Sequence, residues 1–246
     1  MRTSWRYARA VRLFVALALL AGCDQLWGIT RLQPASDATV AIDAVPADAA
    51  CQPQVIHDDF TGTQLCDHWG TPSGLDAVEG GGMLLIAPQP NTGGSQGGCF
   101  SAAPVAFGDD GIFIKVASVV AQDGDGSGGS YMFFTIYSPV PADAATIQLS
   151  IGANRLAAVA PNNVTEGSVA YDPDQMKWWR LRPDHDLPGV AADVSPNGFT
   201  WQTIGRAPGT IPTSVIVQFT AGTYGNGLAD PGKAAIEDFN VCPSSA

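Results

Sequence analysis

Short runs of β-forming residues, separated by Gly, Pro, Asn and Asp, follow one another through most of the chain after residue 80. Several of these runs alternate: Ile147, Leu149 and Ile151 fall on one face of a strand, and polar residues fall on the other. Such alternation is typical of half-buried antiparallel sheets, and no long amphipathic helix is apparent. We therefore predict an all-β domain, an antiparallel sandwich of two sheets or a jelly roll. The predicted strands are GMLLIA, GIFIKVASVVA, SYMFFTIYS, ATIQLSIG, MKWWRLR, GVAADVS, GFTWQTIG, TSVIVQFTA and AAIEDFNV.

The N-terminus has the layout of an export signal. Four arginines and no acidic residue accompany a short apolar segment from Val11 to Ala21. That segment falls short of the roughly 20 residues that a membrane-spanning helix needs. Leu20–Cys23, with the letters LAGC, resembles the lipobox of bacterial lipoproteins. The resemblance implies that residues 1–22 are removed and that Cys23 carries lipid, such as palmitate, which anchors the protein to a membrane.

An ordinary secreted protein with one extra cysteine is the alternative to a lipoprotein. We expect a lipid-anchored protein of the bacterial cell envelope, periplasmic or on the outer surface. Residues 23–50 are rich in Ala, Asp, Val and Pro without apolar periodicity, which is typical of a flexible linker. Residues 51–243 suit a single all-β domain.

The charge balance bears on partners. Residues 1–22 hold four of the 12 basic residues and none of the 23 acidic ones, so the chain from Cys23 onward carries 8 minus 23, or −15. Such a surface repels the phosphates of nucleic acid, which we exclude as a partner. An acidic surface also supplies solubility without any partner.

Apart from Cys23, the chain has an even number of cysteines, which an exported protein can pair as disulfides. No two of them form a CxxC motif, which argues against a zinc ribbon or a thioredoxin-like redox site. Three pairings are open from the residues alone. The four cysteines are Cys51, Cys66, Cys99 and Cys242.

Several enzyme and metal motifs fail on their context. The letters GGSQG around Ser95 match G-x-S-x-G but lie in a glycine-rich loop rather than at a strand-to-helix elbow. GDGSGG, at residues 124–129, has no following helix that would bind a dinucleotide. Asp123 and Asp125 resemble the first half of an EF-hand loop, but Phe134 stands where a bidentate Glu is required. We expect no cofactor, and calcium at this turn stays an alternative to a solvated loop. Residues 184–186, with the letters DHD, read as a polar loop.

Three stretches carry a family resemblance: HDDFTGTQLCDHW, WWRLRPDHDLPGVAADVSPNGFTWQTIG and AAIEDFNV. They are similar to the concanavalin A-like lectin/glucanase superfamily, whose laminin-G-like members follow a W-x-R-x-R strand with a turn reading S-x-D/N-G-x-x-W. Residues 195–201 fit that turn, and Asn197 with Gly198 is also a tight-turn signal. The resemblance implies a jelly roll whose first and last strands are neighbours.

That neighbourhood implies disulfides from Cys51 to Cys242 and from Cys66 to Cys99. A pairing of Cys51 with Cys66, which leaves Cys99 to meet Cys242, is not excluded.

Glucanases of this superfamily carry an E-x-D-x-x-E strand, and none of the glutamates here, Glu79, Glu166 and Glu237, begins or ends that motif. We therefore favour a binding module over an enzyme. A glycan hydrolase that uses a pair of aspartates, or a structural protein of the envelope, is the alternative.

Strand parity proposes a binding surface. In YMFFTIY, the residues Tyr131, Phe133, Thr135 and Tyr137 point away from the core, and in KWWRLR so do Trp178, Arg180 and Arg182. If these sets share one sheet, they form, with Gln148, an aromatic platform with polar groups, as sugar recognition requires. The alternative is that loops cover Trp178 and the tyrosines, and that the arginines neutralise aspartates.

Overall fold

The computed structural model describes residues 56–62, 69–70, 73–74, 77–121, 129–140, 146–160, 164–225 and 227–243. The predictions for the signal segment, Cys23 and the linker lie outside the described residues, as do Cys51, Cys66, Asp123 and Asp125. The described residues contain no helix, and so none that is long and apolar enough to cross a membrane.

Each of the nine predicted segments contributes a strand, and six further strands accompany them. The strands are β1 (Ser73–Gly74), β2 (Ala77–Glu79), β3 (Leu84–Ile86), β4 (Gln96–Phe100), β5 (Val105–Ala106), β6 (Ile112–Val120), β7 (Ser130–Tyr137), β8 (Thr146–Gly152), β9 (Arg155–Ala160), β10 (Val164–Ala170), β11 (Trp178–Pro183), β12 (Gly189–Ser195), β13 (Gln202–Pro208), β14 (Ser214–Thr223) and β15 (Gly232–Phe239).

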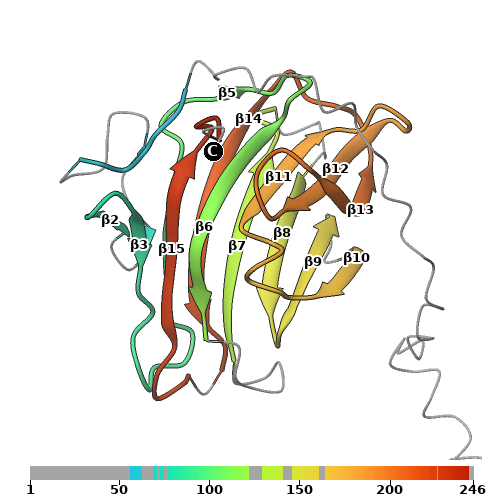
Figure 1. Cartoon of the computed structure of the whole chain (residues 1–246). Helices are drawn as coiled ribbons and strands as arrows, with labels where there is room; N and C mark the ends of the chain where they lie inside the picture. Colours follow the sequence, from blue (N-terminus) through green and yellow to red (C-terminus); the bar gives the residue numbers. More distant parts are fainter. Residues whose placement is uncertain are drawn as a thin grey trace, which may run out of the picture. The chain divides into compact units, whose positions relative to one another are not determined.

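The strands form two antiparallel sheets (Figure 1). One has eight strands in the order β1-β4-β14-β7-β8-β9-β10, with β5 paired to β14. The other has seven strands in the order β13-β12-β11-β6-β15-β3-β2. We call them the eight-stranded and the seven-stranded sheet. Figure 1 shows β15 beside β6 in the second sheet, and β7, β8, β9 and β10 following in turn in the first. This arrangement confirms the predicted two-sheet sandwich.

The core lies between the inward faces of the two sheets, and strand parity predicts these faces correctly. On β7 the inward residues Met132, Phe134 and Ile136 are fully buried, and on β11 so are Trp179 and Leu181. Burying one such side chain contributes roughly 1.5–3 kcal/mol, so the alternation sets the orientation of each strand.

The start of the described domain lies against its last strand. Asp58 pairs with Phe239 through two backbone hydrogen bonds, of 2.9 and 2.8 Å. The side chain of Asn240 donates to the carbonyl oxygen of Ile56 at 3.1 Å and accepts from the backbone N–H of Phe113 at 3.0 Å. The expected closure of the domain by its ends is therefore present at Ile56–Asp58.

The turn between β12 and β13 is built by its own side chains. The hydroxyl of Ser195 accepts from the backbone N–H of Gly198 at 2.8 Å, and Asn197 Oδ1 accepts from those of Phe199 and Thr200, both at 2.9 Å. Gly198 has a φ of +79°, and a Cβ there would come 2.3 Å from Pro243. The S-x-N-G pattern thus encodes this turn, which requires glycine for both conformation and space.

Candidate functional site

The predicted surface residues divide between the two sheets. Trp178, Arg180 and Arg182 lie on β11 in the seven-stranded sheet, whereas Tyr131, Tyr137 and Gln148 lie on β7 and β8 in the eight-stranded sheet. The prediction of one platform shared by both sets is therefore wrong. Parity fixes which face a side chain takes, but not which sheet its strand joins.

Trp178 serves packing. Its side chain is only 5% exposed. The ring centroid of Phe113 lies 6.2 Å away, and Lys115 Nζ lies 6.0 Å above the indole ring. Gly198 packs against it too, since a Cβ at that position would come 3.1 Å from Trp178 Cε2. The indole therefore cannot present its face to a sugar, and the alternative interpretation, cover by neighbouring segments, holds for this residue.

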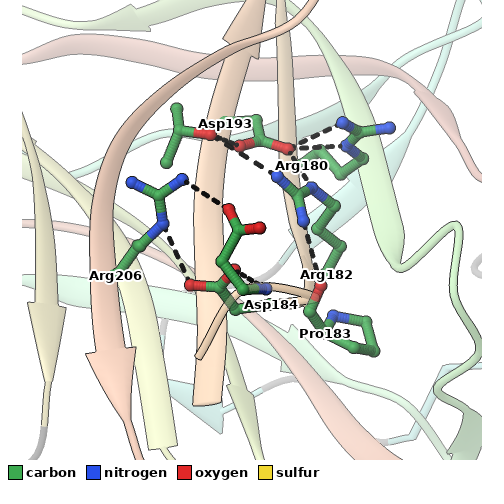
Figure 2. Close-up of polar contacts among 8 residues, drawn as sticks. Arg180, Arg182, Pro183, Asp184, Asp193 and Arg206 are labelled. Carbon is green, nitrogen blue, oxygen red and sulfur yellow. Dashed lines mark hydrogen bonds and ion pairs between the residues drawn. The ribbon is translucent and has the colours of Figure 1, made fainter. Parts of the chain in front are cut away.

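The two arginines of β11 share one buried carboxylate (Figure 2). Asp193 Oδ2 accepts from Arg180 Nε at 3.0 Å, from Arg180 Nη2 at 2.7 Å and from Arg182 Nε at 2.8 Å. Asp193 Oδ1 accepts from the hydroxyl of Thr203 at 2.7 Å. Burial lowers the pKa of Arg180, and the adjacent Asp193 opposes that effect. The indole of Trp201 covers the Arg180 guanidinium at 4.1 Å. We call Arg180, Arg182, Asp193 and Thr203 the arginine–aspartate cluster.

A second ion pair lies beside this cluster in Figure 2. Arg206 Nε lies 3.0 Å from the buried Asp184 Oδ2, and Arg206 Nη2 lies 3.5 Å from Asp186 Oδ2. The DHD loop between β11 and β12 is thus held by an arginine of β13. On this sheet the arginines therefore neutralise aspartates, which is the alternative to sugar binding that the sequence left open.

Four adjacent strands of the eight-stranded sheet carry no charge, whereas β9 and β10 of the same sheet hold Arg155 and Glu166. The four strands β4, β14, β7 and β8 read QGGCF, SVIVQFTAGT, SYMFFTIY and TIQLSIG, without a single charged residue. In the seven-stranded sheet, by contrast, β6, β11, β12, β13 and β15 each hold at least one. The chain has 23 acidic and 12 basic residues, so four neighbouring strands without charge distinguish this region from the rest of the surface.

Three aromatic rings gather at one end of these strands. The centroid of Tyr131 lies 4.6 Å from that of Phe133, with the planes stacked at 20°, and 4.6 Å from that of Tyr224. Tyr131 is buried and donates its hydroxyl to Gln96 Oε1 at 2.8 Å. Phe133 is half-buried and Tyr224 is 38% exposed. Tyr131 therefore supports two rings that meet solvent.

A second pair of rings, Phe100 and Tyr137, stands further along, with centroids 6.5 Å apart and planes at 77°. Along β7, between Phe133 and Tyr137, the strand register places Gln218 and Gln148 on either side of Thr135, and Phe100 lies on the other side of Gln218 in the same row. Gln218 Nε2 donates to the hydroxyl of Thr220 at 2.8 Å. We call this surface the aromatic–amide face. Its residues are Gln96, Phe100, Tyr131, Phe133, Thr135, Tyr137, Gln148, Gln218, Thr220 and Tyr224.

The phenols of this face stay neutral at physiological pH. Burial raises the pKa of Tyr131, Tyr137 and Tyr224, and in Tyr131 the neighbouring Tyr224 adds to the effect. Each hydroxyl therefore keeps its proton and can both donate and accept a hydrogen bond.

Sequence reasoning identified Tyr131, Tyr137 and Gln148 of this face. Phe133 was identified as outward-facing but was not among the candidates. Tyr224 was missed, because it follows the end of β14 and no strand alternation bears on it.

The motif around Ser95 has a structural role. The hydroxyl of Ser95 accepts from the backbone N–H of Gln89 at 2.9 Å, just before β4. This setting agrees with its interpretation as a loop residue. Within the part of the chain that the structure describes, no three His, Cys, Asp or Glu side chains are grouped to hold a metal ion.

Comparison with known proteins bears on the fold. The sequence matches no family model and no curated protein. Among solved structures, the carbohydrate recognition domain of Emp47p is similar over 74% of this chain and 91% of its own, at 15% identity and a TM-score of 0.50. That of Emp46p covers 70% and 86% at 11% identity and 0.47, and the VIP36 exoplasmic/lumenal domain covers 73% and 86% at 13% and 0.44. The likeness to the Emp47p domain confirms the predicted jelly-roll sandwich fold.

Proposed function

We propose that this chain is an envelope lipoprotein whose sandwich domain binds carbohydrate through the aromatic–amide face. A sugar ring has an apolar face of C–H groups and a rim of hydroxyls. It is therefore bound by aromatic rings that accept stacking and by polar groups that exchange hydrogen bonds with the hydroxyls. Phe133 and Tyr224 provide the aromatic rings, and Gln148 and Gln218 provide the polar groups.

The observation that carries the proposal is the neutrality of four adjacent strands that also present aromatic rings to solvent. Exposed apolar surface is costly to keep unless it has a use, and contiguous patches of it mark binding sites. The Emp47p domain, whose fold this chain resembles, is a carbohydrate recognition domain. That likeness supports a glycan as the partner, whereas the geometry of the rings and amides supports the choice of face.

The membrane anchor is the second part of the proposal. The basic N-terminus, the apolar segment and the LAGC letters at residues 20–23 together favour lipidation at Cys23. A lipid on Cys23 and a linker up to residue 50 would hold the sandwich near the membrane, in the periplasm or at the outer surface.

Binding of purified protein, in detergent, to a panel of immobilised polysaccharides and glycans tests the proposed face. We expect retention on at least one glycan, with affinity lowered about tenfold by Phe133→Ala, a loss of about 1.4 kcal/mol. The matched control is Phe199→Ala, because Phe199 is 51% exposed in the β12–β13 turn of the other sheet. No retention of folded wild-type protein on any glycan would refute the proposal, and equal loss in both variants would refute the choice of face.

A further inference from the structure

The two aromatic groups of the aromatic–amide face are separated along one strand. Phe133 and Tyr137 both point outward from β7, four residues apart, which corresponds to about 14 Å at the rise of an antiparallel strand. Tyr131 and Tyr224 extend the first group, and Phe100 extends the second. One sugar ring is too short to touch both groups.

The space between the groups is lined by amides and hydroxyls. The register sets Gln218 of β14 and Gln148 of β8 beside Thr135 of β7. Both glutamine residues are half-buried, so part of each remains exposed to solvent. An amide can donate and accept at once, as the hydroxyls of a sugar can, so this row suits a saccharide unit that lies between two stacked ones.

The absence of charge from β4, β14, β7 and β8 restricts the ligand further. Carboxylate or sulfate groups on a glycan would lose water here and meet no arginine or lysine of these four strands. They would also approach a chain that carries a net charge of −15 from Cys23 onward, which repels anions at low ionic strength. A neutral chain of sugars pays neither cost.

We infer that the aromatic–amide face binds a neutral, linear oligosaccharide segment that lies along β7 and stacks on both aromatic groups, rather than a single terminal sugar. The inference rests on the proposed function, because it names the ligand class and orientation at the same face. It also commits each end of the segment to different rings, Phe133 and Tyr224 at one end and Tyr137 and Phe100 at the other.

Calorimetric titration with three oligosaccharide ladders tests the inference: β-1,4-glucan, β-1,3-glucan and β-1,4-mannan fragments of increasing length, with polygalacturonate as the anionic probe. We expect at least one ladder to bind with an affinity that rises about tenfold or more from the disaccharide to longer fragments and then levels off. Polygalacturonate should bind at least tenfold more weakly than the best neutral fragment.

Variants separate the two ends. Phe133→Ala and Tyr137→Ala should each lower the affinity for the long fragment about tenfold, and the rise of affinity with length should disappear in each. Phe133→Tyr, which keeps a ring, should retain affinity within about threefold, and near-ultraviolet circular dichroism reports whether each variant is folded.

Full affinity for a disaccharide, insensitivity to Tyr137→Ala, or a preference for polygalacturonate would overturn the inference and leave the proposed function standing. If no oligosaccharide of any ladder binds while the glycan panel shows binding, the inference is likewise overturned and the proposed function stands. If the ladders, polygalacturonate and the panel all show no binding, both the inference and the proposed function are overturned.

Discussion

The phenol of Tyr131 crosses β14 at Gly222. The two residues are opposite each other in the register, and a Cβ built at position 222 would come 2.5 Å from Tyr131 Oη. Because glycine leaves this space open, the tyrosine hydroxyl reaches Gln96 across β14, and the ring contacts Phe133 and Tyr224. A single glycine therefore makes room for the ring that holds the first aromatic group together.

Gly222→Ala should displace that ring. The new methyl group would also lie 2.7 Å from the carbonyl oxygen of Ser95, so we expect a loss of about 1–3 kcal/mol in the free energy of unfolding. Glycan affinity should fall several-fold, because Phe133 and Tyr224 lose their support. Urea denaturation and glycan titration measure the two effects. Gly80→Ala is the control, since a Cβ there meets no atom within 4 Å. Unchanged affinity in Gly222→Ala would show that Tyr131 does not support the binding surface.

Asp193→Asn should destabilise the protein without altering the ligand face. The Asp193 side chain is 1% exposed and balances Arg180 and Arg182, which are each 13% exposed. Removing the partner of buried charges costs about 3–5 kcal/mol. Asp174→Asn is the control, because its carboxylate is 87% exposed and 3.9 Å from Lys177, and such surface pairs contribute about 0–1 kcal/mol. Urea midpoints that shift equally in the two variants would contradict a structural role for the arginine–aspartate cluster.

Glycan binding should be insensitive to pH across the neutral range. Burial raises the pKa of Tyr131, Tyr137 and Tyr224 above the ordinary value of about 10, so the protonated phenols persist to higher pH than in water. Affinity should therefore stay constant from about pH 6 to pH 9 and fall only above about pH 10, where phenolates begin to form. Titration calorimetry at several pH values measures the affinity, and ultraviolet absorbance follows the phenolates. A midpoint near neutral pH would instead implicate a different group.

Peptide mapping of the unreduced protein should link Cys51 to Cys242. The predicted link of Cys66 to Cys99 is wrong, because Cys99 lies fully buried in the core and belongs to no disulfide. The contact between Ile56 and Asn240 brings the chain just after Cys51 and the chain just before Cys242 together. Closing so long a loop contributes about 4–5 kcal/mol in the chain-entropy model, so Cys242→Ser should lower the melting temperature. A link between Cys51 and Cys66 would refute this connectivity.

Cys23→Ser should move the protein from the membrane to the soluble fraction, because the proposed lipid has no other attachment point. Metabolic labelling with palmitate should be lost in the same variant, and a Cys99→Ala variant, which keeps Cys23, should stay labelled. Labelling that persists in Cys23→Ser would contradict lipidation at this position.

Local patterns in the sequence predict the strands better than their partners. The alternation in β7 and β11 places Phe134 and Trp179 in the core, as observed. β9 and β10 were not predicted, because their letters, RLAAVA and VTEGSVA, are rich in Ala, Glu and Gly, which are depleted in strands.

The distribution of site residues between the sheets depends on pairing between strands that are distant in the sequence. β11 pairs with β6 and β12, whereas β7 pairs with β14 and β8. Cover by other segments is equally non-local: Pro243 packs against Gly198, which in turn packs against Trp178. Neither relationship leaves a periodic signal in the chain, so the candidate site could be found only in part.

The pairing of Asp58 with Phe239 also has a mechanical consequence. A pull on the chain upstream of Ile56 is resisted first by the hydrogen bonds from Asp58 to Phe239 and from Asn240 to Ile56. It then passes into β15, which is flanked by β6 and β3, and into β6 through the bond between Phe113 and Asn240. Tension that arrives at the N-terminal end of the domain is thus shared among three strands in the interior of a sheet, so the sandwich can resist drag without peeling from an edge.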